Sequence, residues 1–127
     1  MVNHMPLDGG NLSLTRIYAT PDGETHMQEV TIVAGAAIPS AAVIASSYKP
    51  STVDWHTAPR KQFIAHMAGV VETSVSDGTQ RRFGPGDLVY VEDIVGKGHL
   101  TKMIEPVTNL FIRVPDDFDV LAWAKGG

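Results

Sequence analysis

Three short segments, which occur in a fixed order along the chain, decide the fold. They are residues 54–62, Asp-Trp-His-Thr-Ala-Pro-Arg-Lys-Gln; residues 83–87, Phe-Gly-Pro-Gly-Asp; and residues 96–99, Gly-Lys-Gly-His. Between the first two, Gly69 follows Gln62 by seven residues and Asp77-Gly78 comes next. Pro-Gly-Asp and Asp-Gly favour tight turns, because glycine accepts a positive φ. The chain is therefore expected to reverse direction repeatedly around these segments.

Around the three segments, apolar and polar residues alternate with a period of two, which is typical of half-buried strands. The pattern predicts strands at 11–19, 26–33, 42–48, 62–76, 80–83, 88–91, 99–104 and 109–114. Gly69 falls inside the longest of these and indicates a bend. A short C-terminal helix is predicted over 116–124, with Asp116 as its N-cap. Roughly eight to ten short strands with regular turns predict an all-β sandwich or closed barrel.

Composition limits the classes of function that remain open. The 127 residues fit one domain, and the formal net charge of −4 with scattered Lys and Arg argues against nucleic-acid binding. There is no cysteine, so disulfides and thiolate sites are excluded. Residues 1–11 do not resemble a secretory signal, and the apolar stretch 34–45 is too short and interrupted to span a bilayer. We expect a cytoplasmic protein that does not bind membranes.

The ordered segments resemble the two conserved motifs of the cupin superfamily, whose fold is an antiparallel double-stranded β-helix, or jelly-roll barrel. The resemblance covers residues 40–114 and implies a single cupin domain over residues 1–127. His56 matches the first histidine of motif one, Gln62 stands at the glutamate position, and His99 matches the histidine of motif two. Ala58 replaces the second histidine, and Met103 replaces the usual asparagine. The resemblance therefore implies a metal motif that has lost two of its four ligands.

His66 offers a replacement ligand. Side chains alternate along a strand, so Gln62 and His66 are expected on the same face. The interior would then hold His56, His66 and His99, with Gln62 as a weak fourth partner. One reading is a site for one divalent metal (Zn, Fe, Ni or Mn), because imidazole binds such ions well. The other is a metal-free acid–base site, because histidine titrates near neutral pH.

Several other residues are candidates for roles around this interior. Arg60 and Lys61 are candidates for holding an anionic group of the substrate. The residues expected to line the pocket are Tyr48, Trp55, Phe63 and Met103. Three carboxylates, Asp54, Glu92 and Asp93, are candidates for orienting a histidine or moving protons. His4 and His26 lie outside the motif and are expected at the surface.

Three hypotheses of function follow. The first is a small-molecule enzyme of lyase, isomerase or cyclase type, whose interior histidines, with or without a metal, act on a carboxylate- or carbonyl-bearing substrate. The second is a metal-dependent cupin dioxygenase, and the third a cupin that binds a small ligand without catalysis. The fold alone cannot choose between them. The resemblance also implies a homodimer.

Overall fold

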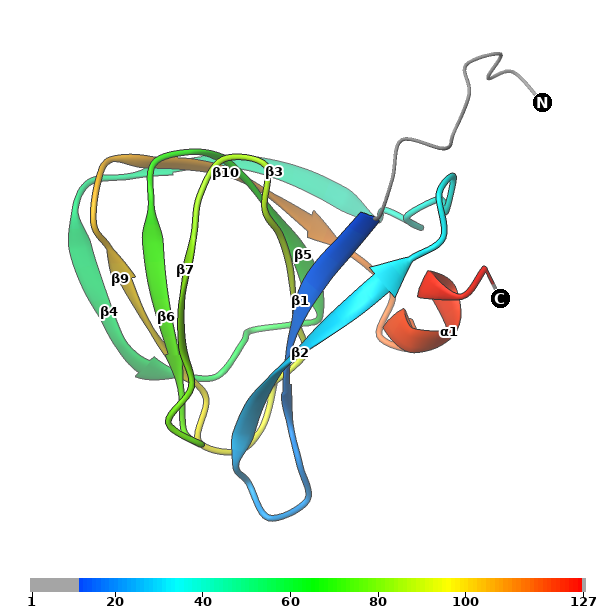
Figure 1. Ribbon diagram of the computed structural model, residues 1–127, viewed down its shortest axis with the longest axis horizontal. Helices are drawn as coiled ribbons and strands as arrows, with labels where there is room; N and C mark the ends of the chain where they lie inside the picture. The colour runs from blue at the N-terminus through cyan, green and yellow to red at the C-terminus, as the bar shows by residue number, and fades with distance from the viewer. Residues whose placement is uncertain (1–11, 127) are drawn as a thin grey trace.

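The computed structural model describes residues 12–126, which form ten strands and one short helix (Figure 1). The strands are β1 (Leu12–Ala19), β2 (Thr25–Ile32), β3 (Ala42–Tyr48), β4 (Ser51–His56), β5 (Gln62–Ala68), β6 (Val71–Val75), β7 (Gln80–Phe83), β8 (Leu88–Val91), β9 (His99–Met103) and β10 (Val107–Arg113); the helix is α1 (Val120–Ala124). No helix in this part of the chain is long and apolar enough to cross a membrane.

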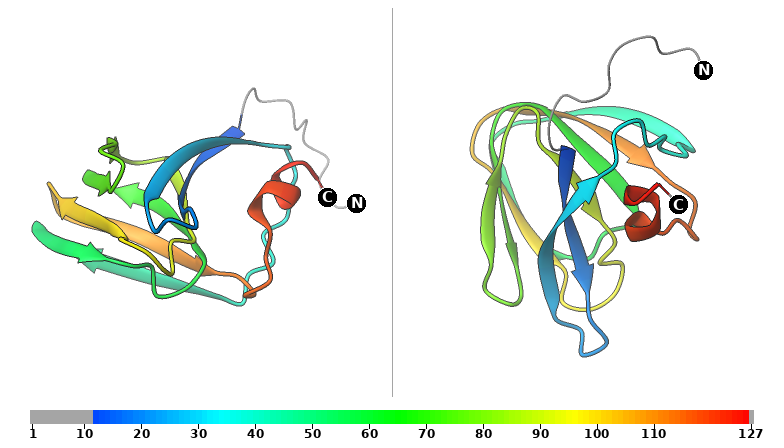
Figure 2. Two further views of the ribbon diagram at one scale, coloured as in Figure 1. Left: turned by 90° about the horizontal axis from the view of Figure 1, so that it is seen from below. Right: turned by 45° about the vertical axis from the view of Figure 1, so that its right-hand side comes forward.

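The strands form two sheets that face each other. The larger sheet has the order β2-β1-β8-β5-β10-β3 and the smaller one the order β4-β9-β6-β7. Neighbouring strands run antiparallel except β1 and β8, which are parallel. Figure 2 shows the two sheets as the walls of a sandwich that is open along its sides rather than closed into a continuous barrel. The predicted all-β jelly-roll fold is confirmed.

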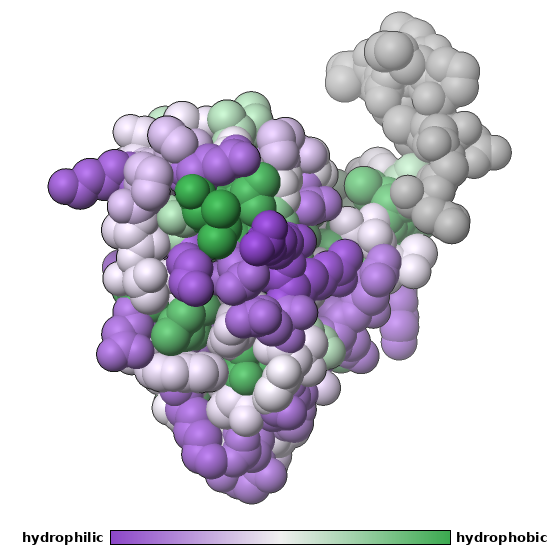
Figure 3. All heavy atoms as spheres, turned by 60° about the vertical axis from the view of Figure 1, so that its left-hand side comes forward, coloured by the Kyte–Doolittle hydropathy of each residue, from purple (hydrophilic) through white to green (hydrophobic). Residues whose placement is uncertain are grey.

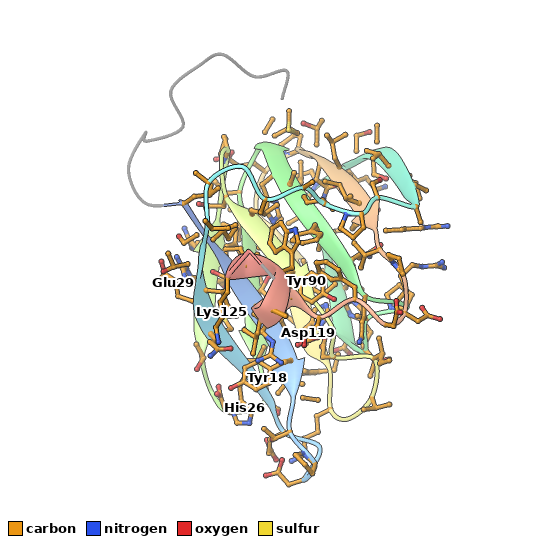
Figure 4. The ribbon with its side chains drawn as sticks, turned by 90° about the vertical axis from the view of Figure 1, so that its right-hand side faces the viewer. Tyr18, His26, Glu29, Tyr90, Asp119 and Lys125 are labelled. Atoms are coloured by element: carbon orange, nitrogen blue, oxygen red, sulfur yellow. The ribbon has the colours of Figure 1, made fainter. Side chains whose placement is uncertain are left out.

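Strand alternation gives the larger sheet two different faces. On β5, Gln62, Ile64 and His66 point toward the smaller sheet and line a cavity. Phe63 points the other way, so the prediction that it lines the pocket is wrong. Phe63 and Tyr90 pack with Val120 and Ala124 of α1 in a separate core on the outer face. Figure 4 shows Tyr90 and Asp119 beside α1 on that side of the sheet. The helix thus covers the outer face, and the cavity lies on the inner face, between the sheets.

Two local predictions need correction, and one strand was missed. The predicted strand 62–76 is two strands in different sheets, because the chain turns at Gly69, which has φ +80°. A β-carbon at Gly69 would lie 2.2 Å from the carbonyl oxygen of Pro106, so the turn leaves no room for a side chain. The helix begins at Val120, since Asp119 and not Asp116 accepts hydrogen bonds from the first helical N–H groups. The strand β4 was not predicted.

The missed strand β4 contains a β-bulge that disguises its alternation. Val53 is in register with Thr101 of β9, and His56 with His99. Three residues of β4 therefore advance against two of β9, so one residue is extra. The bulge lets Val53 and His56 both face the cavity, although they are an odd number of residues apart.

The face of the molecule that Figure 3 shows is mainly hydrophilic. In Figure 3, which brings the side of the molecule with β4 and β9 forward, apolar residues form small patches among polar ones. Buried apolar side chains form two clusters, one beneath α1 and one between the sheets, whereas others, such as Val43, Met67 and Val95, are exposed. Residues 1–11, which include His4 and the start of the first predicted strand, and residue 127 lie outside the described part.

Candidate active site

A cavity of about 500 Å³ lies between the two sheets. Most of its lining is aliphatic or aromatic, including Tyr48 and Met103. Its polar lining side chains are Ser46, His56, Arg60, Gln62, His66, Thr73, His99, Thr101, Asn109 and Arg113. No Asp or Glu of residues 12–126 is among the lining residues. The volume suits one small organic molecule, and the charged groups on the wall are cationic or able to become so.

His99, the first residue of β9, is oriented by a buried carboxylate. Its Nδ1 lies 2.5 Å from Oδ2 of Asp93, and the two residues are 7% and 0% exposed. Asp93 itself is held by its backbone, because its carbonyl accepts a hydrogen bond from Ala58 N–H at 3.0 Å. With Nδ1–H donating to the carboxylate, Nε2 carries the lone pair and can accept a proton. Asp93 therefore acts behind His99 and does not line the cavity.

His56 lies beside His99 at the end of β4. The two ring centroids are 4.4 Å apart, with 59° between the ring planes. The Nδ1 of His56 lies 2.7 Å from the backbone carbonyl oxygen of Asp54, so Nδ1–H donates to this carbonyl and Nε2 takes no part in the hydrogen bond. The bulge in β4 and the register of β4 with β9 bring together these two histidines, which are 43 residues apart in the sequence.

The same bulge turns Trp55 outward, so the prediction that it lines the main cavity is wrong. Trp55 is 48% exposed and borders a shallow outer depression. Lys61 does not line the cavity either, because it precedes the inward-facing Gln62 on the alternating strand. Asp54 and Glu92 are also directed elsewhere: the Asp54 carboxylate accepts from Trp55 N–H, and Glu92 forms an ion pair with Arg16.

Arg113 is a cavity residue that the sequence analysis missed. It ends β10, lines the cavity and is in register with Gln62 of β5. Its Nε is buried and has no hydrogen-bond partner among the described residues. Arg60, in the loop between β4 and β5, lines the same end. The loop and the register place these residues at the end of the sandwich that also carries His56 and His99.

His66 lies at the other end of the cavity. It faces the same way as Gln62, as predicted, but four residues at about 3.3 Å each separate their backbones by about 13 Å. Its ring stacks on Phe83 with a centroid distance of 5.9 Å. Burial lowers the pKa of His66, and the charge of Asp87 opposes this shift more weakly. The structure thus does not bring His66 to the His56–His99 pair.

The donor set does not fit the divalent metal that the cupin resemblance implies. Within residues 12–126, no three His, Cys, Asp or Glu side chains are grouped so that they could hold a metal ion. His56 and His99 offer two Nε2 atoms, whereas the Asp93 carboxylate is engaged by Nδ1 of His99. Gln62 could add only a neutral amide oxygen, a weak ligand for such metals. Two imidazoles fall short of the three protein ligands usual in catalytic zinc sites.

Burial of His66 makes a prediction about stability in acid. Because the folded-state pKa lies below its ordinary value of 6.5, the unfolded chain binds the proton more readily. The contribution of His66 to stability is therefore present above about pH 6.5 and is lost as the pH falls toward the folded-state pKa. Relative to His66→Gln, the wild type should lose up to about 1.4 kcal/mol of unfolding free energy per pH unit in this window. Urea unfolding of both proteins between about pH 7 and pH 5 measures this difference, and a difference that does not vary with pH contradicts it.

Comparison with known proteins adds information on the fold. No family model and no curated protein matches the chain. A protein from Salmonella typhimurium described as ethanolamine utilization protein Q superposes with a TM-score of 0.50 at 12% identity, over 86% of this chain and all (100%) of that one. NMB1881 from Neisseria meningitidis matches with a TM-score of 0.48 at 11% identity, over 88% of this chain and 90% of that one. KdgF from Halomonas sp. matches with a TM-score of 0.41 at 22% identity, over 80% of this chain and 90% of that one.

At 12% identity the likeness to the Salmonella protein bears on the fold and not on the chemistry. The Salmonella protein superposes on this chain along its full length. Together with the strand order, this superposition shows that the chain has a jelly-roll fold.

Proposed function

We propose that the protein is a small-molecule enzyme that performs metal-independent acid–base chemistry of lyase, isomerase or cyclase type. The observation that carries the proposal is the pair of imidazoles at one end of an apolar cavity, one of them hydrogen-bonded to a buried carboxylate. A histidine held in one tautomer by a carboxylate is a suitable general base. A second histidine 4.4 Å away supplies the acid that such reactions also need.

The proposed roles follow from the free nitrogens. Nε2 of His99 removes a proton from a carbon next to a carbonyl group, and Asp93 stabilises the resulting imidazolium. His56, doubly protonated at the start of the step, donates a proton from Nε2 to the carbonyl oxygen. The product of this step is an enol, and one proton has moved to His99 while one has left His56. The enol then eliminates a leaving group or is reprotonated at another carbon, which gives the lyase or isomerase outcome.

The charge of the cavity indicates the class of substrate. Two arginines line the end that holds the histidines, and no carboxylate of residues 12–126 lines it to balance them. A guanidinium binds a carboxylate through paired hydrogen bonds, and Arg113, whose buried Nε has no hydrogen-bond partner among the described residues, is the proposed partner of the carboxylate. The proposed substrate is therefore a carboxylate that also bears a carbonyl group, with an apolar body that fits the aliphatic wall.

Proton exchange with solvent tests this proposal before the substrate is known. The protein would be incubated in D₂O with a panel of 2-oxo and 3-oxo carboxylates, and deuterium incorporation at the carbon next to the carbonyl would be followed by NMR. We expect catalysed exchange for at least one compound, and we expect it to survive dialysis against EDTA.

Other outcomes separate the alternative functions. Exchange that disappears with EDTA and returns with zinc overturns the metal-independent mechanism. Oxygen uptake that depends on added Fe²⁺ identifies the dioxygenase instead. Carboxylates that bind tightly with no exchange at any pH identify a ligand-binding protein without catalysis.

A further inference from the structure

A second group of polar side chains lies in the cavity, at the end opposite the proposed chemistry. Asn109 of β10 is in register with His66 of β5 on one side and with Ser46 of β3 on the other. All three line the cavity, so they form a continuous row across the wall. Side chains directly opposite each other on neighbouring strands are close enough to act on one ligand group. We call these three residues the distal row.

Two residues of the distal row, His66 and Asn109, are buried but incompletely hydrogen-bonded, whereas Ser46 is partly exposed. His66 is 6% exposed and Asn109 7%. Neither Nδ1 of His66 nor Oδ1 of Asn109 has a hydrogen-bond partner among the described residues. Buried polar groups without partners destabilise a protein, and native structures contain few of them. The two side chains lie opposite each other in register on the cavity wall, and a bound ligand toward which they turn would complete these hydrogen bonds.

We propose that the distal row is a binding subsite for an uncharged hydrogen-bonding group of the ligand, with a hydroxyl as the best match. A hydroxyl both donates and accepts, and the row offers both kinds of partner in the Asn109 amide and the His66 ring. A charged ligand group is less suitable, because none of the three side chains of the row carries a charge that would balance it. Burial also holds the pKa of His66 down, so the ring is uncharged at neutral pH.

The position of the row sets the shape of the ligand. Apolar side chains, Ile44, Ile64 and Phe111, occupy the next inward-facing positions between the distal row and the Arg113 end. Arg113 and Asn109 are four residues apart on β10, about 13 Å along the strand, and the length of the arginine side chain shortens the gap. A ligand that reaches both ends is elongated, with a carboxylate at one end, a hydroxyl at the other and an apolar middle. This part of the inference rests on the proposed function, because it takes the carboxylate from there.

Matched pairs of simple ligands test the subsite. Affinities of the 6-, 8- and 10-carbon ω-hydroxy acids would be measured by calorimetry against the corresponding unsubstituted acids. At one chain length we expect the hydroxyl to strengthen binding by about two- to tenfold, the range of one additional neutral hydrogen bond. The side-chain amide NMR signal of Asn109 should shift with the hydroxy acid more than with the plain acid. A hydroxyl that gives no gain at any length overturns the proposal.

Two further experiments test ligand binding at the distal row independently of the proposed proton-transfer chemistry. 1-Octanol carries a hydroxyl and no carboxylate, so it should shift the Asn109 signal even if the Arg113 end binds nothing. In Asn109→Leu and His66→Phe, the preference should pass to the unsubstituted acid, whereas Thr108→Leu, an exposed position on the same strand, should keep the wild-type preference. None of these measurements depends on turnover.

Thermal unfolding without ligand distinguishes a binding role from a structural one. If the distal row is kept for a ligand, Asn109→Leu should unfold at the same temperature as the wild type or a higher one, because it removes an unpaired buried group. A clear fall in the unfolding temperature of Asn109→Leu would show that the row serves the fold, and it would overturn the proposal.

Discussion

His99→Ala is expected to lower the rate of catalysed proton exchange by about 10²- to 10⁴-fold, the usual contribution of a positioned general base. The residue lines the cavity, and Asp93 holds its ring so that Nε2 is the basic atom. Removing the ring removes the proton acceptor but leaves Arg113 and the apolar wall in place. The affinity for unreactive carboxylates should therefore change much less than the rate.

Asp93→Asn tests whether the exchange rate depends on the tautomer of the His99 ring and not only on the presence of that ring. An asparagine amide can donate to Nδ1 of His99, which favours the tautomer with the proton on Nε2 and removes the basic atom from the cavity. We expect a large fall in the exchange rate with the His99 ring still present. The NMR signals of the His99 ring nitrogens should report the change of tautomer.

His26→Ala is the matched control for the His99 substitution. His26 pairs with Asp77 near the surface and does not line the cavity, so the exchange rate should stay at the wild-type value. Full exchange activity in both His56→Ala and His99→Ala would refute the site assignment. Loss in His26→Ala equal to that in His99→Ala would show that the assay reports folding rather than chemistry.

The sequence predicted the fold and the central histidines because both depend on local signals. Turn residues such as Asp77-Gly78 and Gly84-Pro85-Gly86 mark where strands reverse, and alternation marks which side chains face inward. The motif positions of His56 and His99 are fixed relative to those turns. The structure places these two histidines side by side in the cavity, although their catalytic role is a prediction that experiment must test.

The parts that the sequence did not predict depend on how far along the cavity a side chain lies and on which residues of neighbouring strands are paired. Alternation says that Gln62 and His66 share a face, but it does not say that His66 lies about 13 Å farther along the cavity. The outward turn of Trp55 depends on a bulge, which a two-residue period cannot represent. Arg113 was missed because its closeness to Gln62 comes from pairing between β5 and β10, which are distant in sequence.

Gly98→Ala is expected to destabilise the protein by at least about 3 kcal/mol and to separate the two histidines. Gly98 has φ +74°, and a β-carbon there would lie 2.2 Å from the carbonyl oxygen of His56 and 2.4 Å from its carbonyl carbon. These are backbone atoms, so a rotamer change cannot relieve the clash. The end of β4 would have to move away from β9, at the place where His56 and His99 are paired.

Gly78→Ala provides the control that isolates the clash. Gly78 has φ +94°, but a β-carbon there would meet no atom within 4 Å. It should therefore show only the cost of a positive φ for alanine, about 1–2 kcal/mol. Urea unfolding measures both costs, and equal losses in the two variants would show that the backbone at residue 98 adapts without strain. If the clash governs, Gly98→Ala should also lose proton exchange under conditions where the chain is still folded, because the absence of a side chain at residue 98 is what lets the two imidazoles meet.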